Sequence, residues 1–309
     1  MTVICRNFLD VLTRTADTSD LSTTHRVAAC NVLCGTIEQC VQANDASLKD
    51  LVFSSEMLGG LFKIYIDHYD NGKSKAMKQV LSTIVKLLGK APAAQAVDTT
   101  TSRCLDLALK ERDRSRAKPA LHALTIFLSR NVLSVSQLVL LYACVVTGVD
   151  PKSVKETINH YQADFISSLL AWIPVGDIAP TAGQLLSAVA GDASGWSPAS
   201  TDSTTPLPVW AEPLVRGIEA TPDAIHAYRY HAFPALFQSG IQVYVRFLEY
   251  LDFEQLLGLA TVDTKHNDEP SSTGEIRRLV LLSALQAGKT SGLVQECSKY
   301  EILVMLYSS

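Results

Sequence analysis

The stretch from Leu105 to Arg130, LDLALKERDRSRAKPALHALTIFLSR, constrains the fold more than any other part of the chain. Its first residues close an apolar helix, and the run Lys110 to Lys118 then holds five basic and two acidic side chains in nine residues. Because a buried unpaired charge loses its hydration, this run must be a solvated turn or helix end. Pro119 suits the first turn of a helix, where its missing N–H costs nothing. The predicted local structure is therefore helix, charged turn, helix.

The helix after this turn carries one apolar stripe, with residues spaced three or four apart: Ala117, Ala120, Leu121, Leu124, Phe127 and Leu128. A related pattern recurs along the chain, in which a basic residue is followed by a small or apolar residue at +3 and an apolar one at +7. The matches are Arg26-Ala29-Leu33, Lys73-Ala76-Val80, Arg114-Ala117-Leu121 and Arg277-Val280-Ala284. The first three basic residues lie 47 and then 41 positions apart. This recurrence predicts an all-α fold of stacked helix pairs, with basic residues in the turns and the +3 and +7 positions packed inward.

The charged turn Asp113-Arg114-Ser115-Arg116, followed by Ala117, Leu121 and Leu124, resembles the HEAT-repeat superfamily. The resemblance covers about residues 20 to 130 in register and about residues 274 to 305 by pattern. The family usually has an apolar residue where Asp113 stands, so HEAT and armadillo repeats both remain open. The resemblance implies an α-solenoid that binds other macromolecules, and it supplies no catalytic residues.

The composition of the sequence changes after Ile173, and this change predicts three segments. Residues 1–175 form the N-terminal helical-repeat segment, and 176–209 form a polar loop insertion, rich in Pro, Ser and Thr, with one short helix at Thr181 to Ala190. Residues 210–309 are expected to continue the same array. The last apolar run, Ile302 to Tyr307, has no polar cap after it, so we expect a longer array or a partner that covers this end.

Composition limits the function classes. The net charge of −4 gives no general electrostatic reason to bind nucleic acid or anionic membrane. The seven cysteines are odd in number and scattered, which argues against a disulfide framework. The longest apolar run, Leu138 to Val149, is shorter than the ~20 residues that a bilayer requires. With no convincing signal peptide at the N-terminus, we expect no membrane partner and a location in the cytoplasm or nucleus.

Three short patterns hint at chemistry, and each has a simpler structural interpretation. Ala287-Gly288-Lys289-Thr290 looks like the end of a phosphate loop, but Ser283 stands where that motif needs glycine, so a helix C-cap is favoured. Cys30 and Cys34 share a helical face near His25, yet Cys30 also lies in an apolar stripe, so both are expected to be buried hydrophobes.

The third pattern is the pair His226 and His231, which diverge on a helix because they are five residues apart and are expected to be ordinary polar positions. Nothing pairs a nucleophile with a histidine and an acid by a local motif. The sequence therefore predicts a protein that is not an enzyme and has no catalytic residue, no metal site and no small-molecule cofactor.

The basic turn is the best candidate for binding, and its cations are Lys110, Arg112, Arg114, Arg116 and Lys118. Arg26 and Lys73 would extend it as a ladder along one edge of a solenoid, in contact with an acidic peptide or an RNA backbone. The simpler interpretation is a solvated turn whose cations pair with Glu111 and Asp113. The hypothesis that follows is a non-catalytic scaffold that binds proteins within a larger assembly. The alternative is a solenoid that positions RNA for a partner enzyme, for example in tRNA modification.

Overall fold

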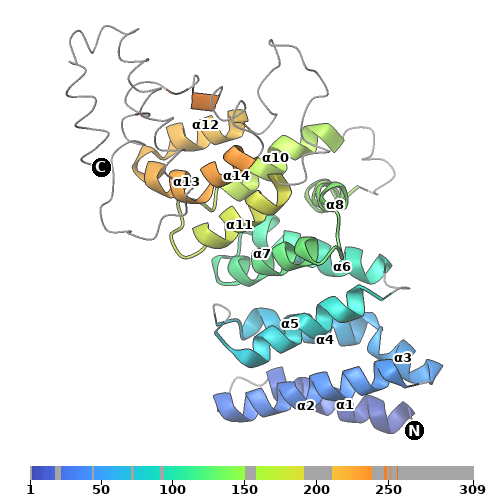
Figure 1. Cartoon of the computed structure of the whole chain (residues 1–309). Helices are drawn as coiled ribbons and strands as arrows, with labels where there is room; N and C mark the ends of the chain where they lie inside the picture. Colours follow the sequence, from blue (N-terminus) through green and yellow to red (C-terminus); the bar gives the residue numbers. More distant parts are fainter. Residues whose placement is uncertain are drawn as a thin grey trace, which may run out of the picture. The chain divides into compact units, whose positions relative to one another are not determined.

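The computed structural model describes residues 2–17, 22–43, 45–70, 73–90, 94–149, 158–190 and 211–238, together with Phe247, Leu248, Leu251 and Leu256. Within these residues every regular element is a helix and none is a strand (Figure 1), so the predicted all-α class is confirmed. The chain divides into two compact units, residues 1–158 (unit 1) and residues 159–309 (unit 2). Each unit is treated by itself below.

Five helices of unit 1 begin with a side chain that caps the first backbone N–H groups. The elements are α1 (Thr2–Asp17), α2 (Thr23–Gln42), α3 (Ala46–Val52), α4 (Ser55–Asp67), α5 (Lys75–Leu88), α6 (Ala94–Leu105), the π-helical turn η1 (Asp106–Lys110), α7 (Arg114–Ser129) and α8 (Val135–Thr147). The side chains that cap backbone N–H groups are those of Ser22, Asp45, Ser54, Asp113 and Ser134. Such caps satisfy donors that the first helical turn leaves unpaired.

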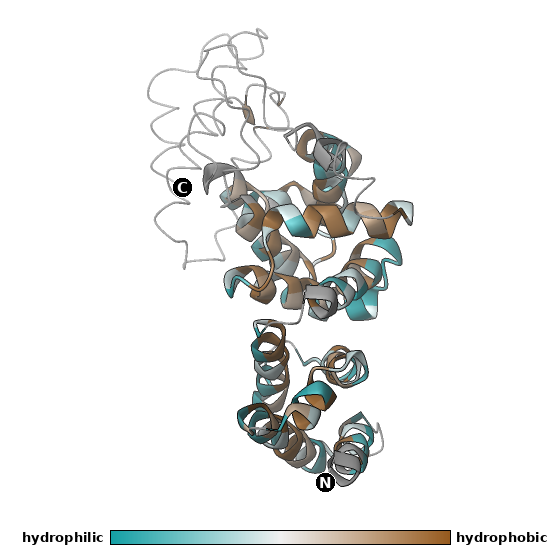
Figure 2. Cartoon of the chain, turned by 90° about the vertical axis from the view of Figure 1, so that its right-hand side faces the viewer, coloured by the Kyte–Doolittle hydropathy of each residue, from teal (hydrophilic) through white to brown (hydrophobic). Residues whose placement is uncertain are grey.

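The helices of unit 1 pack as successive pairs. Helix α1 packs on α2, α4 packs on α5, and α6 packs on α7. Each pair also contacts the next, because α4 packs on both α1 and α6, while α5 packs on both α2 and α7. Helix α8 packs on α6. Most of these helices carry both apolar and polar residues (Figure 2), which is the pattern that one buried face requires.

In the three matches that the structure describes, the +3 and +7 positions lie in the core, as predicted. All six are buried: Ala29, Leu33, Ala76, Val80, Ala117 and Leu121. Ala29 is 8% exposed, and the other five are at most 1% exposed. A fully buried leucine or valine stabilises the fold by about 1.5–3 kcal/mol through removal of apolar surface from water. The repeated pattern therefore marks the buried face of α2, α5 and α7.

Unit 2 is built from shorter helices around an aromatic core. Its elements are α10 (Ile158–Leu170), α11 (Ala179–Ala190), α12 (Ala211–Ala220), the 3-10 turn η3 (Pro222–Ala224), α13 (Ile225–His231) and α14 (Phe233–Gln238). Helix α11 packs on α13 and α14. The rings of Phe233 and Phe247 meet edge to face, with centroids 5.5 Å apart. Phe165 and Tyr228 are also buried in this unit.

The predicted three-segment division at 175 and 209 stays a prediction. The short helix expected at 181–190 corresponds to α11, whose Leu185 and Leu186 are buried in unit 2. The polar stretch that follows, at 191–209, and the part of the expected array beyond Thr273 lie outside the described residues, as do Arg277 and the Gly288-Lys289 pattern. Among the helices that can be examined, none is both long and apolar enough to cross a bilayer.

Candidate functional site

The five cations of the predicted basic turn lie on η1, on the loop after it and on the start of α7. Lys110 ends η1, Arg112 follows in the loop, and Arg114 opens α7. These three side chains are exposed, whereas Arg116 and Lys118, both in α7, are half-buried. The first three cations of the turn are therefore solvated, as predicted, whereas the last two are partly covered by protein.

A widened helix end shapes this turn. The backbone N–H of Glu111 donates to the carbonyl of Asp106 at 2.7 Å, and that of Asp113 donates to the carbonyl of Leu107 at 3.1 Å. Between them, Arg112 adopts a left-handed conformation with φ 52°. Asp113 then caps α7 by accepting from the Ser115 N–H at 3.0 Å. A hydrogen bond from the Ser115 hydroxyl lowers the pKa of the Asp113 carboxyl, so the cap carries a negative charge at neutral pH.

Replacing Arg112 by glycine is expected to raise the free energy of unfolding by about 1 kcal/mol, because a left-handed conformation costs a residue with a Cβ roughly that much. Urea unfolding followed by far-UV circular dichroism measures the change. Arg112→Ala is the matched control, since it removes the same charge and keeps the Cβ. Equal stabilities for the glycine and alanine variants would show that backbone strain at this position is negligible.

Carboxylates stand between the cations of this region. Arg116 lies 3.5 Å from Asp67 of α4 and 3.7 Å from Asp113, measured between side-chain nitrogen and oxygen. Lys110 lies 4.0 Å from Asp106, which also accepts a hydrogen bond from Arg103 at 3.1 Å. The turn is therefore a mixed-charge surface instead of a purely cationic one.

Arg26 and Lys73 occupy different settings from each other. Lys73 is exposed in the loop just before Ser74 and α5, as expected of a turn residue. Arg26 lies inside α2, because Ser22 caps that helix and α2 begins three residues before Arg26. The placement of Arg26 in a turn was therefore wrong, although its +3 and +7 partners are buried. The ladder that would join Arg26 to Lys73 and Arg114 stays a prediction.

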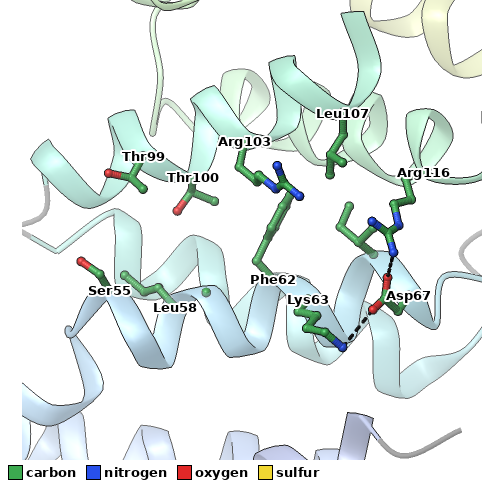
Figure 3. Close-up of a pocket in the computed structure, with 12 residues that line it drawn as sticks. Ser55, Leu58, Phe62, Lys63, Asp67, Thr99, Thr100, Arg103, Leu107 and Arg116 are labelled. Carbon is green, nitrogen blue, oxygen red and sulfur yellow. Dashed lines mark ion pairs between the residues drawn. The ribbon is translucent and has the colours of Figure 1, made fainter. Parts of the chain in front are cut away.

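A groove lies beside the charged turn, between α4 and α6 (Figure 3), and has a volume of about 380 Å³. Its floor is apolar, and the side chains that form it come from α4 and η1: Leu58, Phe62, Ile66 and Leu107. Polar residues line its rim: Ser55 and Lys63 on α4, and Thr99 and Arg103 on α6. Thr100 of α6 also lines the groove and is buried. Gly59 leaves the α4 side open, because nothing lies within 4 Å of the position that a Cβ would take.

One end of the groove is charged. Lys63 lies between Asp17 of α1, at 2.5 Å, and Asp67, at 3.1 Å. Its hydrogen bond to Asp17 raises the pKa of the Lys63 ammonium. Arg103 and Arg116 line the same groove from α6 and α7, with side chains that are 50% and 43% exposed. Figure 3 shows both guanidinium groups pointing into the groove.

Sequence reasoning found only one residue of this groove, Arg116. The local signals for three others exist, since Lys63 pairs with Asp67 at i,i+4 and Arg103 pairs with Asp106 at i,i+3. Such pairs are common on helix surfaces and contribute little to stability, so they do not single out a site. The groove depends on how α4, α6 and α7 pack, and the pattern of a single helix does not contain that information.

The cysteine and histidine candidates occupy structural positions. Cys30 and Cys34 are fully buried, and burial raises the pKa of the Cys30 thiol to about 11 and also raises that of Cys34. His25 is exposed, and its ring Nδ1 lies 2.8 Å from the hydroxyl of the capping Ser22. In the described parts of the chain, no group of three or more His, Cys, Asp or Glu side chains is arranged to hold a metal ion. His231 is half-buried in α13, whereas the side chain of His226 lies outside the described residues.

A part-buried polar pair joins α4 to α7. The hydroxyl of Tyr65 lies 2.7 Å from Nδ1 of His122, and Tyr65 is 1% exposed. Burial raises the pKa of Tyr65 and lowers the pKa of His122 below its ordinary value of 6.5. A neutral His122 either accepts from the tyrosine hydroxyl at Nδ1 or donates to it, depending on the tautomer, whereas a protonated ring can only donate there.

Unit 1 is expected to lose stability as the pH falls below 6.5, because His122 binds protons more weakly in the folded state than in the unfolded one. The contribution of His122 to the free energy of unfolding is fully present above the pKa of the unfolded state. It is lost as the pH falls from that value to the lower pKa of the folded state. Urea unfolding of the full chain between pH 7.5 and about 5 measures this dependence. His122→Gln should unfold with a shallower pH dependence, and a slope equal to that of the original chain would rule out this source.

Comparison of the chain with protein-family models, with curated proteins and with solved structures found no match.

Proposed function

We propose that α1 to α8 form a short α-solenoid of the HEAT or armadillo type, and that the chain is a non-catalytic scaffold that binds other proteins within a larger assembly. The contacts between helices support this arrangement. Helices α1, α4, α6 and α8 form one row of neighbours, while α2, α5 and α7 form a second row. Repeat proteins in which each unit contacts only its neighbours present extended surfaces, and they use these surfaces for binding.

The observation that carries the proposal is the groove between α4 and α6, which are neighbours in the first row. A groove with an apolar floor and a polar rim is the arrangement by which proteins bind a partner segment, since the floor supplies affinity and the rim supplies orientation. The packing of adjacent repeats creates such a groove without any catalytic group.

The buried thiols support a reducing compartment, which we propose to be the cytoplasm or nucleus. Cys30, Cys34 and Cys104 lie in the core of unit 1, each fully buried. Burial raises the pKa of all three, which keeps them in the unreactive thiol form. These residues serve as small hydrophobes in the packing of the helix pairs.

The mixed charges of the turn favour a protein partner over RNA. A phosphate backbone approaching Arg116 or Arg103 would also face Asp67, Asp106 and Asp113, which lie within 4 Å of those cations. Like charges in contact disfavour binding, so a polyanion gains less here than it would at a purely basic stripe. RNA binding is therefore the competing outcome of the experiment below.

The test uses the tagged full chain, purified from its own cells and sized by light scattering, and compares it with Arg114→Glu/Arg116→Glu. The expected result is a complex that contains another protein in a defined ratio, and that survives nuclease treatment. Titration of the purified chain with tRNA is expected to show only weak binding. A chain that recovers no protein but binds tRNA, with an affinity that falls steeply with salt and with the charge reversal, would overturn the scaffold proposal in favour of RNA positioning.

A further inference from the structure

We propose that the groove between α4 and α6 binds a peptide segment in which a large apolar side chain lies next to an aspartate or glutamate. This inference rests on the proposed scaffold function and goes beyond it by naming the chemistry of the partner. Three features of the groove support it: the floor, the open side and the charged end.

The floor selects a large apolar side chain. Phe62 and Leu58 line it from α4, and Leu107 lines it from η1. The volume of about 380 Å³ lies at the low end of the range for ligand sites, which is about 300–1,000 Å³. A leucine, isoleucine, methionine or phenylalanine side chain that enters this space gains the free energy of burying its apolar surface.

The open side selects a chain over a small molecule. Sites for small ligands enclose most of the ligand surface. Here Ser55, Gly59 and Thr99 are all exposed along the rim, and Gly59 adds no side chain to close it. A peptide that continues past both ends of the groove needs this openness, because its backbone remains in contact with water.

The charged end selects one carboxylate. The charged residues that line the groove are three cations, Lys63, Arg103 and Arg116, and one acid, Asp67. The ion pairs of Arg116 measure 3.5 and 3.7 Å, which exceeds the usual hydrogen-bond length of about 2.7–3.2 Å, so its N–H groups retain capacity for a bidentate acceptor. The acids around this end limit the excess of positive charge, which suits a single carboxylate better than a polyanion.

Gly59 allows the groove to be filled without disturbing the fold. A Cβ at this position meets nothing within 4 Å, and the change from glycine improves helix propensity by up to about 1 kcal/mol. Gly59→Leu should therefore keep or raise the melting temperature while its side chain occupies the groove. Gly35→Leu is the matched control, since Gly35 lies inside α2, also has nothing within 4 Å of its Cβ position and does not line the groove.

The experiment selects binders to the full chain from a displayed library of random linear peptides, and it measures the affinity of the enriched peptides as synthetic ligands by fluorescence polarisation. Enriched sequences are expected to combine a large apolar residue with a nearby Asp or Glu. Their affinity should fall at least about tenfold for Gly59→Leu and stay within about twofold for Gly35→Leu. Only the first variant fills the part of the groove that the apolar side chain of the peptide enters.

The double variant Arg103→Gln/Arg116→Gln tests the acidic half of the proposal. It should lower the affinity for the acidic peptide by about tenfold, which corresponds to one charge-assisted contact. The affinity for the matching peptide with Asn or Gln in place of the acid should stay nearly unchanged. Binders without an acid, or binders indifferent to Gly59→Leu, would overturn the inference. If proteins still co-purify with Gly59→Leu from cells while no library peptide depends on the groove, this inference fails and the scaffold function stands.

Discussion

Replacing Phe127 by alanine is expected to lower the free energy of unfolding of unit 1 by about 3–5 kcal/mol, as large-to-small changes of buried aromatic residues do. Phe127 is fully buried on α7, the helix that contacts both α4 and α5 of the preceding pair. Loss of its ring therefore leaves a cavity in the core beside α7. Urea unfolding followed by far-UV circular dichroism, with hydrogen exchange of peptides from α7, measures the effect.

Leu128→Ala is the control for Phe127→Ala, because Leu128 is the next residue on the same helix and is only half-buried. Leu128→Ala should lower the free energy of unfolding clearly less than Phe127→Ala, since part of the Leu128 side chain is already in water. If both variants lost the same stability, the buried face of α7 would not be the one described here.

Replacing Gly183 by alanine is expected to destabilise unit 2 by about 1–3 kcal/mol, although alanine is the better helix former. A Cβ on Gly183 of α11 would lie 2.4 Å from the carbonyl oxygen of His231, at the end of α13. Because the obstacle is backbone and not the tip of a flexible side chain, the two helices must separate. Tryptophan fluorescence follows this unit, since Trp172 is buried there and all three tryptophans lie in residues 159–309.

Gly176→Ala serves as the control in the same unit, because nothing lies within 4 Å of its Cβ position. This variant should be neutral or slightly stabilising, since alanine restricts the unfolded chain more than glycine does. A loss of stability at Gly176 as large as that at Gly183 would show that the close approach of α11 and α13 is not the cause.

The periodicity of apolar residues predicted most of the helices of unit 1. The apolar residues of 74–88, for example, repeat with a helical period and Gly89 follows, which predicts the helix that the structure shows as α5 at Lys75–Leu88. The burial of Leu33, Val80 and Leu121 followed from the same pattern. These features are local, so the sequence of one helix contains them.

Sequence analysis did not predict two features, because both depend on structure beyond one helix. One is the π-helical turn at Asp106–Lys110 with the left-handed Arg112 after it, where the sequence has no glycine to indicate a left-handed position. The groove combines residues of α4, η1, α6 and α7, and only the packing of these elements places Arg103 and Arg116 at the same end of it. Sequence analysis therefore identified the charged turn and missed the apolar floor beside it.

The most direct test of the central claim places a photo-crosslinking amino acid at Thr99, on the exposed rim of the groove, in the full chain expressed in its own cells. The control position is Ser82, which is exposed on α5 and does not line the groove. A protein scaffold that uses this groove should be crosslinked from Thr99 to one partner protein, at a segment that combines apolar and acidic residues, and not from Ser82. Crosslinks to RNA, equal crosslinking from both positions, or no protein adduct from Thr99 would contradict the account.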